Sequence, residues 1–210
     1  MESGFHQNHV ELCGIVAEAP RLSHENRGES FYHFPLRVER LSGQEDTLPV
    51  LVSRTLLQTA AVEEGTALTV AGQLRSFNNK SGQGSRLVIS VFARSLREEA
   101  EARPYNRILL SGAICRPPTL RRTPLGRCIC DLILAVNRRY GRADYLPCIA
   151  WGQVAQQVSV LPVGEPLYLE GRVQSRSYTK VLGDTAEKRT AFEVSVMHLL
   201  EEESMAQRSD

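Results

Sequence analysis

Polar and apolar residues alternate most regularly between Leu167 and Tyr178, in the segment LYLEGRVQSRSY. Successive side chains of a strand point to opposite faces, so this alternation predicts a β-strand with Leu167, Leu169 and Val173 on one face. The opposite face then carries polar, basic and aromatic residues: Tyr168, Glu170, Arg172, Gln174, Arg176 and Tyr178. Arginines beside aromatic rings suit a phosphate backbone that carries flat bases. Taken alone, however, the segment is explained more simply as a half-exposed strand with solvated basic residues.

The first half of the chain has the apolar pattern of five strands and one helix. The expected strands are short apolar or alternating runs bounded by polar turns, and they cover residues 9–17, 31–41, 47–53, 66–77 and 86–95. Residues 54–63 contain no helix-breaking residue and predict a short helix that ends before Gly65. The segment SHENRGES, between the first two strands, is expected to be a polar loop.

The second half of the chain repeats this pattern. Three pairs of segments correspond at an offset of 98 or 99 positions: residues 8–14 with 106–112, residues 48–49 with 146–147, and residues 65–76 with 164–175. A nearly constant offset across three separated segments indicates an internal duplication.

Five strands with a helix between the third and the fourth are the element order of the OB-fold, a partly open five-stranded Greek-key barrel. A small SH3-like barrel lacks this helix, and an immunoglobulin-like sandwich needs about seven strands. The sequence therefore predicts an all-β protein of two tandem OB-fold barrels. The expected domains are residues 1–95 and 105–201, with a charged linker at 96–104 and a short disordered tail at 202–210. The linker is alternatively a short terminal helix of the first domain.

The composition excludes several classes of protein. The chain has 210 residues, 42% of them hydrophobic, which fits one large domain or two of about 100 residues. No apolar run approaches the roughly 20 residues of a membrane span, and the first residues lack a secretory pattern. A cytoplasmic, nucleoid-associated location is therefore expected. No nucleotide-binding, hydrolase or convergent carboxylate motif is present, so the sequence predicts no enzyme and no cofactor.

The cysteines indicate reduced thiols. The chain contains Cys13, Cys115, Cys128, Cys130 and Cys148, an odd number without a CxxC pair. Cys128 and Cys130 share a strand face, but no second pair or nearby histidine completes four metal ligands. His6 and His9 have HxxH spacing without a helical context. We therefore expect small buried side chains and no metal site.

The two halves differ in charge. Residues 1–104 contain 11 Lys and Arg and 13 Asp and Glu, a net charge of −2, whereas residues 105–200 contain 13 and 7, a net charge of +6. Positive charge on the second half is what a polyanion partner requires.

Aromatic residues of the second half fall beside its arginines. Tyr140 follows the second strand, and Tyr145 and Trp151 share one face of the third strand with Pro147 and Ile149. Each stacked base contributes roughly 1–3 kcal/mol, whatever the base. The candidate stacking residues are Tyr140, Tyr145, Trp151 and Tyr178, together with Phe77 of the first half. The candidate phosphate contacts are Arg116, Arg121, Arg122, Arg138, Arg139, Arg142, Arg172 and Arg176. The alternative for any single aromatic, Trp151 included, is packing in the core.

These residues give the second half a resemblance to the bacterial single-stranded DNA-binding protein (SSB) family. The resemblance runs over about residues 106–200: NRILLSG is similar to the family's first strand, CDLILAVNRRY to its second, DYLPCIAWG to its third and YLEGRVQSRSY to its fourth. It implies base stacking after the second strand, at both ends of the third and at the end of the fourth. Tyr140, Tyr145, Trp151 and Tyr178 occupy those places.

Several residues depart from the family pattern. Tyrosine stands at three places where the family usually has tryptophan, and Pro147 replaces a commonly basic residue. The last residues, EEESMAQRSD, do not resemble the family's protein-recruiting tail. The first half is less similar, because Thr47 and Ser53 stand near the positions of Tyr145 and Trp151. This pattern suggests a first barrel kept for architecture or for a protein partner.

Sequence-independent binding of single-stranded DNA in replication, recombination or repair is the function these features predict. The resemblance also implies a homodimer that presents four barrels, with possible replication or recombination proteins as partners. Two alternatives stay open: an adaptor similar to the primosomal members of the superfamily, whose first barrel binds a replisome protein, and a binder of RNA instead of DNA.

Overall fold

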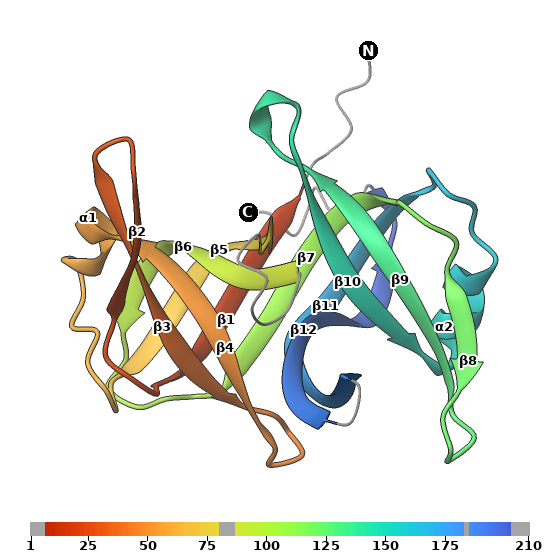
Figure 1. Cartoon of the computed structure of the whole chain (residues 1–210), viewed down its shortest axis with the longest axis horizontal. Coiled ribbons are helices and arrows are strands. Elements are labelled where there is room, and N and C mark those ends of the chain that lie inside the picture. Colours follow the sequence, from red (N-terminus) through yellow and green to blue (C-terminus); the bar gives the residue numbers. More distant parts are fainter. Residues whose placement is uncertain (1–6, 80–86, 183–184, 203–210) are drawn as a thin grey trace. The chain divides into compact units, whose positions relative to one another are not determined.

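The first copy of the repeat forms a closed barrel. The structure, a computed structural model, describes residues 7–79, 87–182 and 185–202 (Figure 1). The elements of the first copy are β1 (Asn8–Val16), β2 (Arg21–Asn26), β3 (Glu29–Glu39), β4 (Glu45–Ser53), α1 (Arg54–Leu57), β5 (Ala67–Asn78) and β6 (Leu87–Glu98). β1 pairs antiparallel with β3 and β5, β3 pairs antiparallel with β4, and β6 pairs parallel with β4 and antiparallel with β5. These pairings close five strands in the order of the OB-fold, as predicted.

The second copy has the same topology. Its elements are β7 (Tyr105–Ile114), β8 (Thr119–Arg122), β9 (Cys128–Asn137), η1 (Arg139–Gly141), β10 (Ala143–Trp151), α2 (Gly152–Ser159), β11 (Pro166–Leu182) and β12 (Thr185–Leu200). β7 pairs with β9 and β11, β9 with β10, and β10 runs parallel to β12, which neighbours β11. The register is conserved as well, because Phe31 pairs with Ser53 in the first copy and Ile129 with Trp151 in the second, 98 positions later.

Each barrel closes through a glycine at the same place in the repeat. A Cβ atom at Gly14 would collide with the carbonyl oxygen of Arg37, and one at Gly112 would lie 2.8 Å from the carbonyl oxygen of Ala135. Only glycine permits this approach of two backbones without a shift.

The alternation along β11 is confirmed as far as Val173. Leu167, Leu169, Gly171 and Val173 are buried, and the three residues that alternate with them, Tyr168, Glu170 and Arg172, are half-exposed. From Gln174 to Thr179 both faces of β11 carry exposed or half-exposed residues. The strand therefore leaves the barrel core at this point.

Two elements differ from the prediction. The segment expected to be a loop, residues 23–30, includes most of β2, which pairs with β3 across a turn at Arg27 and Gly28, whose φ angles are 51° and 79°. All six residues of β2 are exposed, so no apolar pattern marks the strand. The predicted helix at 54–63 ends at Leu57, and the Ala61 amide donates instead to Glu98 Oε1 (2.5 Å).

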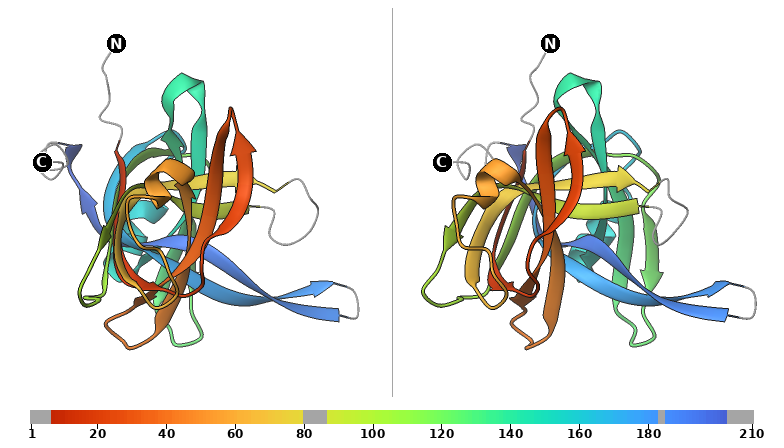
Figure 2. Two further views of the ribbon diagram at one scale, coloured as in Figure 1. Left: turned by 90° about the vertical axis from the view of Figure 1, so that its left-hand side faces the viewer. Right: turned by 60° about the vertical axis from the view of Figure 1, so that its left-hand side comes forward.

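The chain forms two compact units whose boundary does not coincide with the boundary of the repeat. The first unit contains residues 9–107 together with residues 174–192, and the second unit contains residues 108–173 and 193–210 together with residues 1–8. Residues 174–192, which we call the arm, are the outer part of the β11–β12 hairpin (Figure 2). The predicted domains 1–95 and 105–201, which follow the repeat, stay a prediction. β6 also extends through Glu98 into the stretch 96–104, and the tail 203–210 lies outside the described residues.

The five cysteines are free thiols, as expected. Cys13, Cys130 and Cys148 are buried, and burial raises the pKa of Cys130 and of Cys148. In the described part of the chain, no three metal-ligating side chains gather in one place and no helix is long and apolar enough to cross a membrane.

Candidate nucleic-acid interface

Three exposed aromatic side chains lie along the β9–β10 hairpin of the second unit. Tyr145 and Trp151 project from the same face of β10 and are 51% and 39% exposed. Tyr140, in the turn before β10, is 95% exposed. Ile149, predicted to share their face, is buried where β10 is flanked by both β9 and β12, whereas Pro147 is half-exposed. Tyr145 and Trp151 therefore share one face of β10, and the buried Ile149 lies between them on that face.

Tyr140 is held in an unfavourable backbone conformation. Its φ and ψ are 64° and 36°, in the left-handed region that a bulky side chain rarely occupies. The Arg138 amide donates to the Arg142 carbonyl (2.7 Å) and closes this turn. A non-glycine residue in this region costs roughly 1–3 kcal/mol, and such strain concentrates at functional positions. The turn therefore displays a fully exposed ring at a cost in stability.

The predicted phosphate contacts of the second unit differ in their exposure to solvent. Arg116, Arg122 and Arg142 are exposed, Arg172 is half-exposed, and the side chain of Arg139 lies outside the described residues. Arg121 is exposed and forms an ion pair with Asp131, in which Nη2 lies 3.1 Å from Oδ1. Exposed pairs of this kind contribute about 0–1 kcal/mol, so Arg121 remains available to an anion.

Arg138 has a different environment from the other arginines. Its guanidinium binds both carboxylate oxygens of Asp144, which is completely buried. Arg40 and Asp46 form the same pair in the first copy, 98 positions earlier. A buried carboxylate requires such a partner, because an unpaired buried charge is strongly destabilising. The pair gives Arg138 a structural role, and the phosphate contact predicted for it stays a prediction.

Tyr178 and Arg176 lie in the first unit, on the arm. The Arg176 guanidinium carbon is 5.8 Å from the centre of the Tyr178 ring, and Arg176 is exposed. On the neighbouring strand, hydrogen bonds from Arg189 to Glu187 raise the pKa of Arg189, and a smaller contribution comes from Tyr178. Sequence reasoning missed Arg189, although β11–β12 pairing brings it next to Tyr178. The four predicted stacking positions of the second copy are thus divided between two units.

The first unit also contains aromatic residues that sequence reasoning missed. His24 stacks on Phe31 with ring centres 5.1 Å apart, Phe31 lies 6.0 Å from Phe92, and the Arg94 guanidinium carbon lies 4.8 Å from the centre of the Phe92 ring. Phe31 is the direct partner of Ser53, the residue at the position of Trp151 in the repeat. The strand register could have indicated Phe31, because β4 has Ser53 where the second copy has Trp151 and the paired position on β3 is aromatic. Phe77, predicted from the sequence, is 42% exposed on β5.

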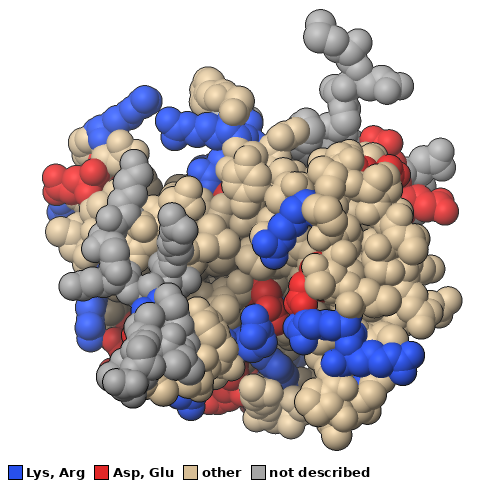
Figure 3. Space-filling view, turned by 45° about the vertical axis from the view of Figure 1, so that its right-hand side comes forward, with Lys and Arg blue, Asp and Glu red and all other residues tan. Residues whose placement is uncertain are grey.

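Charge alone does not define the interface. The face in Figure 3 carries Lys and Arg side chains in separate groups, with acidic residues and uncharged surface between them. The aromatic side chains and their flanking arginines are therefore the more specific feature.

These barrels and their exposed rings define a tandem OB-fold protein. The single-strand binding protein family matches residues 105–200. A single-stranded DNA-binding protein of Halalkalibacterium halodurans is 36% identical over 99 residues, which cover 44% of this chain and 56% of that protein's length. A single-stranded DNA-binding protein of Deinococcus radiodurans is 26% identical over 208 residues, which cover 82% of this chain and 68% of that protein. A crystal structure of a deletion mutant of the Thermus aquaticus single-stranded DNA binding protein superposes with a TM-score of 0.72 at 25% identity, covering 93% of this chain and 94% of that one.

The similarity extends beyond the region that the family matches. The Deinococcus and Thermus proteins correspond to most of the present chain, both barrels included. Residues 105–200 thus match the single-strand binding protein family, and the whole chain, with its two OB-fold domains, is similar to single-stranded DNA-binding proteins that also span both barrels.

Proposed function

We propose that the protein binds single-stranded DNA without sequence preference and without catalysing a reaction. The observation that carries this proposal is the set of exposed rings on the β9–β10 hairpin, namely Tyr140, Tyr145 and Trp151. Exposed rings are costly in water and suit stacking against bases, which is insensitive to base identity. The relatives are named as single-stranded DNA-binding proteins, which supports the same ligand.

The phosphate contacts that we propose are arginines predicted from the sequence, six in the second unit and one on the arm: Arg116, Arg121, Arg122, Arg139, Arg142, Arg172 and Arg176. Neutralised phosphates release counterions, so the logarithm of affinity should fall with the logarithm of salt concentration by about 0.7 for each phosphate contact. Action on DNA in replication, recombination or repair accords with the cytoplasmic location expected from the sequence.

Titration of the Trp151 fluorescence with oligo-dT tests the proposal. Trp151 is the single tryptophan, so quenching on addition of DNA reports directly on the proposed interface. Single-stranded DNA should bind with steep salt dependence, and duplex DNA should compete poorly. Absence of binding at low salt would refute the proposal, and stronger competition by RNA would assign the interface to RNA.

A homodimer with four barrels is the assembly that we propose for this chain. Its support is the relationship to the SSB family. The mass of the protein in solution, measured by light scattering with and without oligo-dT, tests it. A monomer under both conditions would exclude this assembly.

A further inference from the structure

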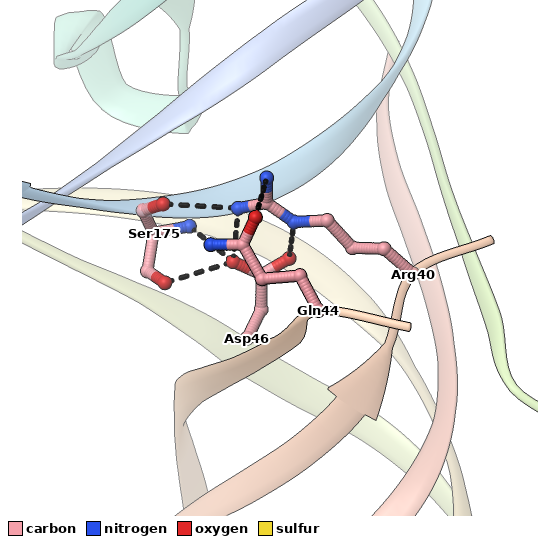
Figure 4. Close-up of polar contacts among 4 residues, drawn as sticks. All are labelled: Arg40, Gln44, Asp46 and Ser175. Atoms are coloured by element: carbon pink, nitrogen blue, oxygen red, sulfur yellow. Dashed lines mark hydrogen bonds and ion pairs between the residues drawn. The ribbon is translucent and has the colours of Figure 1, made fainter. Parts of the chain in front are cut away.

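The arm is fastened to the first barrel at one buried carboxylate, Asp46. Asp46 Oδ1 accepts hydrogen bonds from the Ser175 amide (2.7 Å) and the Ser175 hydroxyl (2.8 Å) (Figure 4). Arg40 donates to the same carboxylate from Nε and Nη2, both at 2.6 Å. The Arg40 Nη2 also donates to the Ser175 carbonyl (3.0 Å). The backbone of Ser175 is thereby held at both its amide and its carbonyl by residues 129 and 135 positions away. We call this group of three residues the latch.

The latch holds a charged carboxylate in a buried position. Burial by itself raises the pKa of Asp46, but the hydrogen bonds from Arg40 and Ser175 outweigh burial, and the pKa lies below its usual 3.8. Asp46 is 1% exposed, so the ionised group depends on these donors. Hydrogen bonds to a charged partner are about twice as strong as neutral ones. The contact is therefore a specific anchor for the arm and more than a surface ion pair.

The latch lies immediately before the functional side chains of the arm. Ser175 precedes Arg176, and Tyr178 follows three residues after Ser175. β11 has left the barrel core by this point, because both of its faces carry exposed or half-exposed residues from Gln174 to Thr179. Fixing the Ser175 backbone therefore determines the direction in which Arg176 and Tyr178 are presented.

The arm supplies the first unit with side chains that differ from those of its own barrel. At the positions of Tyr145 and Trp151 it has Thr47 and Ser53. Residues 9–107 contain 12 Lys and Arg and 12 Asp and Glu, so this part of the first unit is neutral. The arm contains four basic and two acidic residues and gives the first unit its positive excess. The arm thus adds to the first unit a further ring, Tyr178, and the net positive charge needed for a polyanion.

We propose that the latch makes Tyr178 and Arg176 part of a single-stranded nucleic-acid surface on the first unit, so that the first barrel uses binding residues encoded in the second copy. The inference rests on the proposed function. Asp46 and Ser175 are positioning residues in it, and they do not contact the ligand. The first barrel is then a binding module completed by the arm.

A double-mutant cycle on the full-length protein tests the inference. Tyr178→Ala should weaken oligo-dT binding about 5- to 150-fold, the range for loss of one stacked base. Asp46→Asn, which releases the arm, should weaken it by a smaller factor. In the Tyr178→Ala background, Asp46→Asn should weaken binding by a smaller factor than it does in the wild type, because only Arg176 is then left to be misplaced. Ser177→Ala, an exposed neighbour on the arm, is the matched control and should bind as the wild type does.

A second pair of variants covers the case in which Asp46→Asn impairs folding. Ser175→Ala removes only the hydroxyl contact, and a milder loss of binding is expected that is again smaller in the Tyr178→Ala background. Ser175→Thr keeps a hydroxyl and should restore binding. Amide hydrogen exchange should show faster exchange at Ser175 in Asp46→Asn than in the wild type.

The outcomes separate this inference from the proposed function. If the wild type binds oligo-dT and Trp151→Ala weakens binding, but Asp46→Asn and Tyr178→Ala act additively, the inference is overturned and the proposed function stands. If the wild type does not bind, the proposed function fails and the inference fails with it. Unchanged exchange at Ser175 in Asp46→Asn would show that the carboxylate does not anchor the arm.

Discussion

The outer faces of β3–β4 and β9–β10 have the same strand register and different chemistry. Ser53 and Trp151 occupy the same place, directly before the helix of each copy. The Ser53 hydroxyl accepts a hydrogen bond from the Leu56 amide (3.2 Å) and caps α1, whereas Trp151 leaves α2 without a side-chain cap and presents its ring to solvent. One position thus contributes to helix stability in the first copy and to the exposed face in the second.

The turns of the two hairpins show the same contrast. Arg40 and Gln44 close the first turn with a backbone hydrogen bond of 2.7 Å, and Arg138 and Arg142 close the second with the same length. Glycine alone adopts a positive φ in the first turn, at Gly43, whereas the second turn also places Tyr140 there. The duplication has kept the closing bonds and the buried Arg–Asp pair while the exposed side chains have diverged.

The buried pair common to both copies should give the largest effect on stability. Asp144→Asn should lower the free energy of unfolding by about 3 kcal/mol, the lower end of the range for a broken buried pair, because Arg138 keeps partial access to water. Urea denaturation measures this. Asp131→Asn, which breaks the exposed pair with Arg121, is the control and should cost about 0–1 kcal/mol. Equal losses in the two variants would contradict a structural role for Arg138.

Substitutions at Trp151 and Ser53, the residues directly before the two helices, should affect DNA binding and stability in opposite ways. Trp151→Ser should weaken binding of single-stranded DNA by about 1–3 kcal/mol and leave stability unchanged or improved, because serine supplies an N-cap oxygen. Anisotropy with labelled oligo-dT and thermal unfolding report the two effects. Ser53→Ala should do the opposite, with about 1 kcal/mol less stability and unchanged binding. Val160→Ala, at an exposed residue outside the aromatic face, controls for loss of apolar surface.

Relief of strain in the second turn should separate stability from binding. Tyr140→Asn should raise the free energy of unfolding by about 1 kcal/mol, because asparagine tolerates the left-handed region, and should weaken DNA binding. Tyr145→Asn, in regular strand β10, should weaken binding without a gain in stability. A stability loss in Tyr140→Asn would show that the ring packs against the protein.

The smallest effect near neutral pH is expected from titration of Asp46. Its pKa is lowered in the folded protein, so the stabilisation by the latch is fully present above 3.8 and is lost as the pH falls through the folded pKa. The stability difference between wild type and Asp46→Asn should therefore be constant from pH 5 to 8 and shrink below about pH 3.8. Denaturation curves at several pH values measure it. If the difference in the free energy of unfolding shrank near pH 6 instead, its pH dependence would come from a histidine and not from Asp46.

The barrels were predictable from the sequence, because a strand with one buried face has apolar residues at every second position. Leu167, Leu169 and Val173 show it, and the constant offset of the repeat extends it to both copies. β2 has no such pattern of apolar residues, because all its side chains are exposed and only its backbone pairs with β3.

The site was predictable in part. The rings of Tyr140, Tyr145 and Trp151 follow from strand parity. The role of Arg138 was visible only in the repeated spacing Arg40–Asp46 and Arg138–Asp144. The association of Tyr178 with the first unit depends on Ser175 meeting a carboxylate 129 residues away, and no local pattern encodes that contact.

The latch also has a consequence for the order in which the protein folds during synthesis. Chains emerge from the ribosome at about 5–20 residues per second, N-terminal end first. Arg40 can pair with Asp46 as soon as the first barrel forms, but the Ser175 donors arrive only after most of the second copy has been made. The contact between Asp46 and Ser175 therefore forms late, and a nascent chain that stops before Ser175 leaves Asp46 without two of its hydrogen-bond donors.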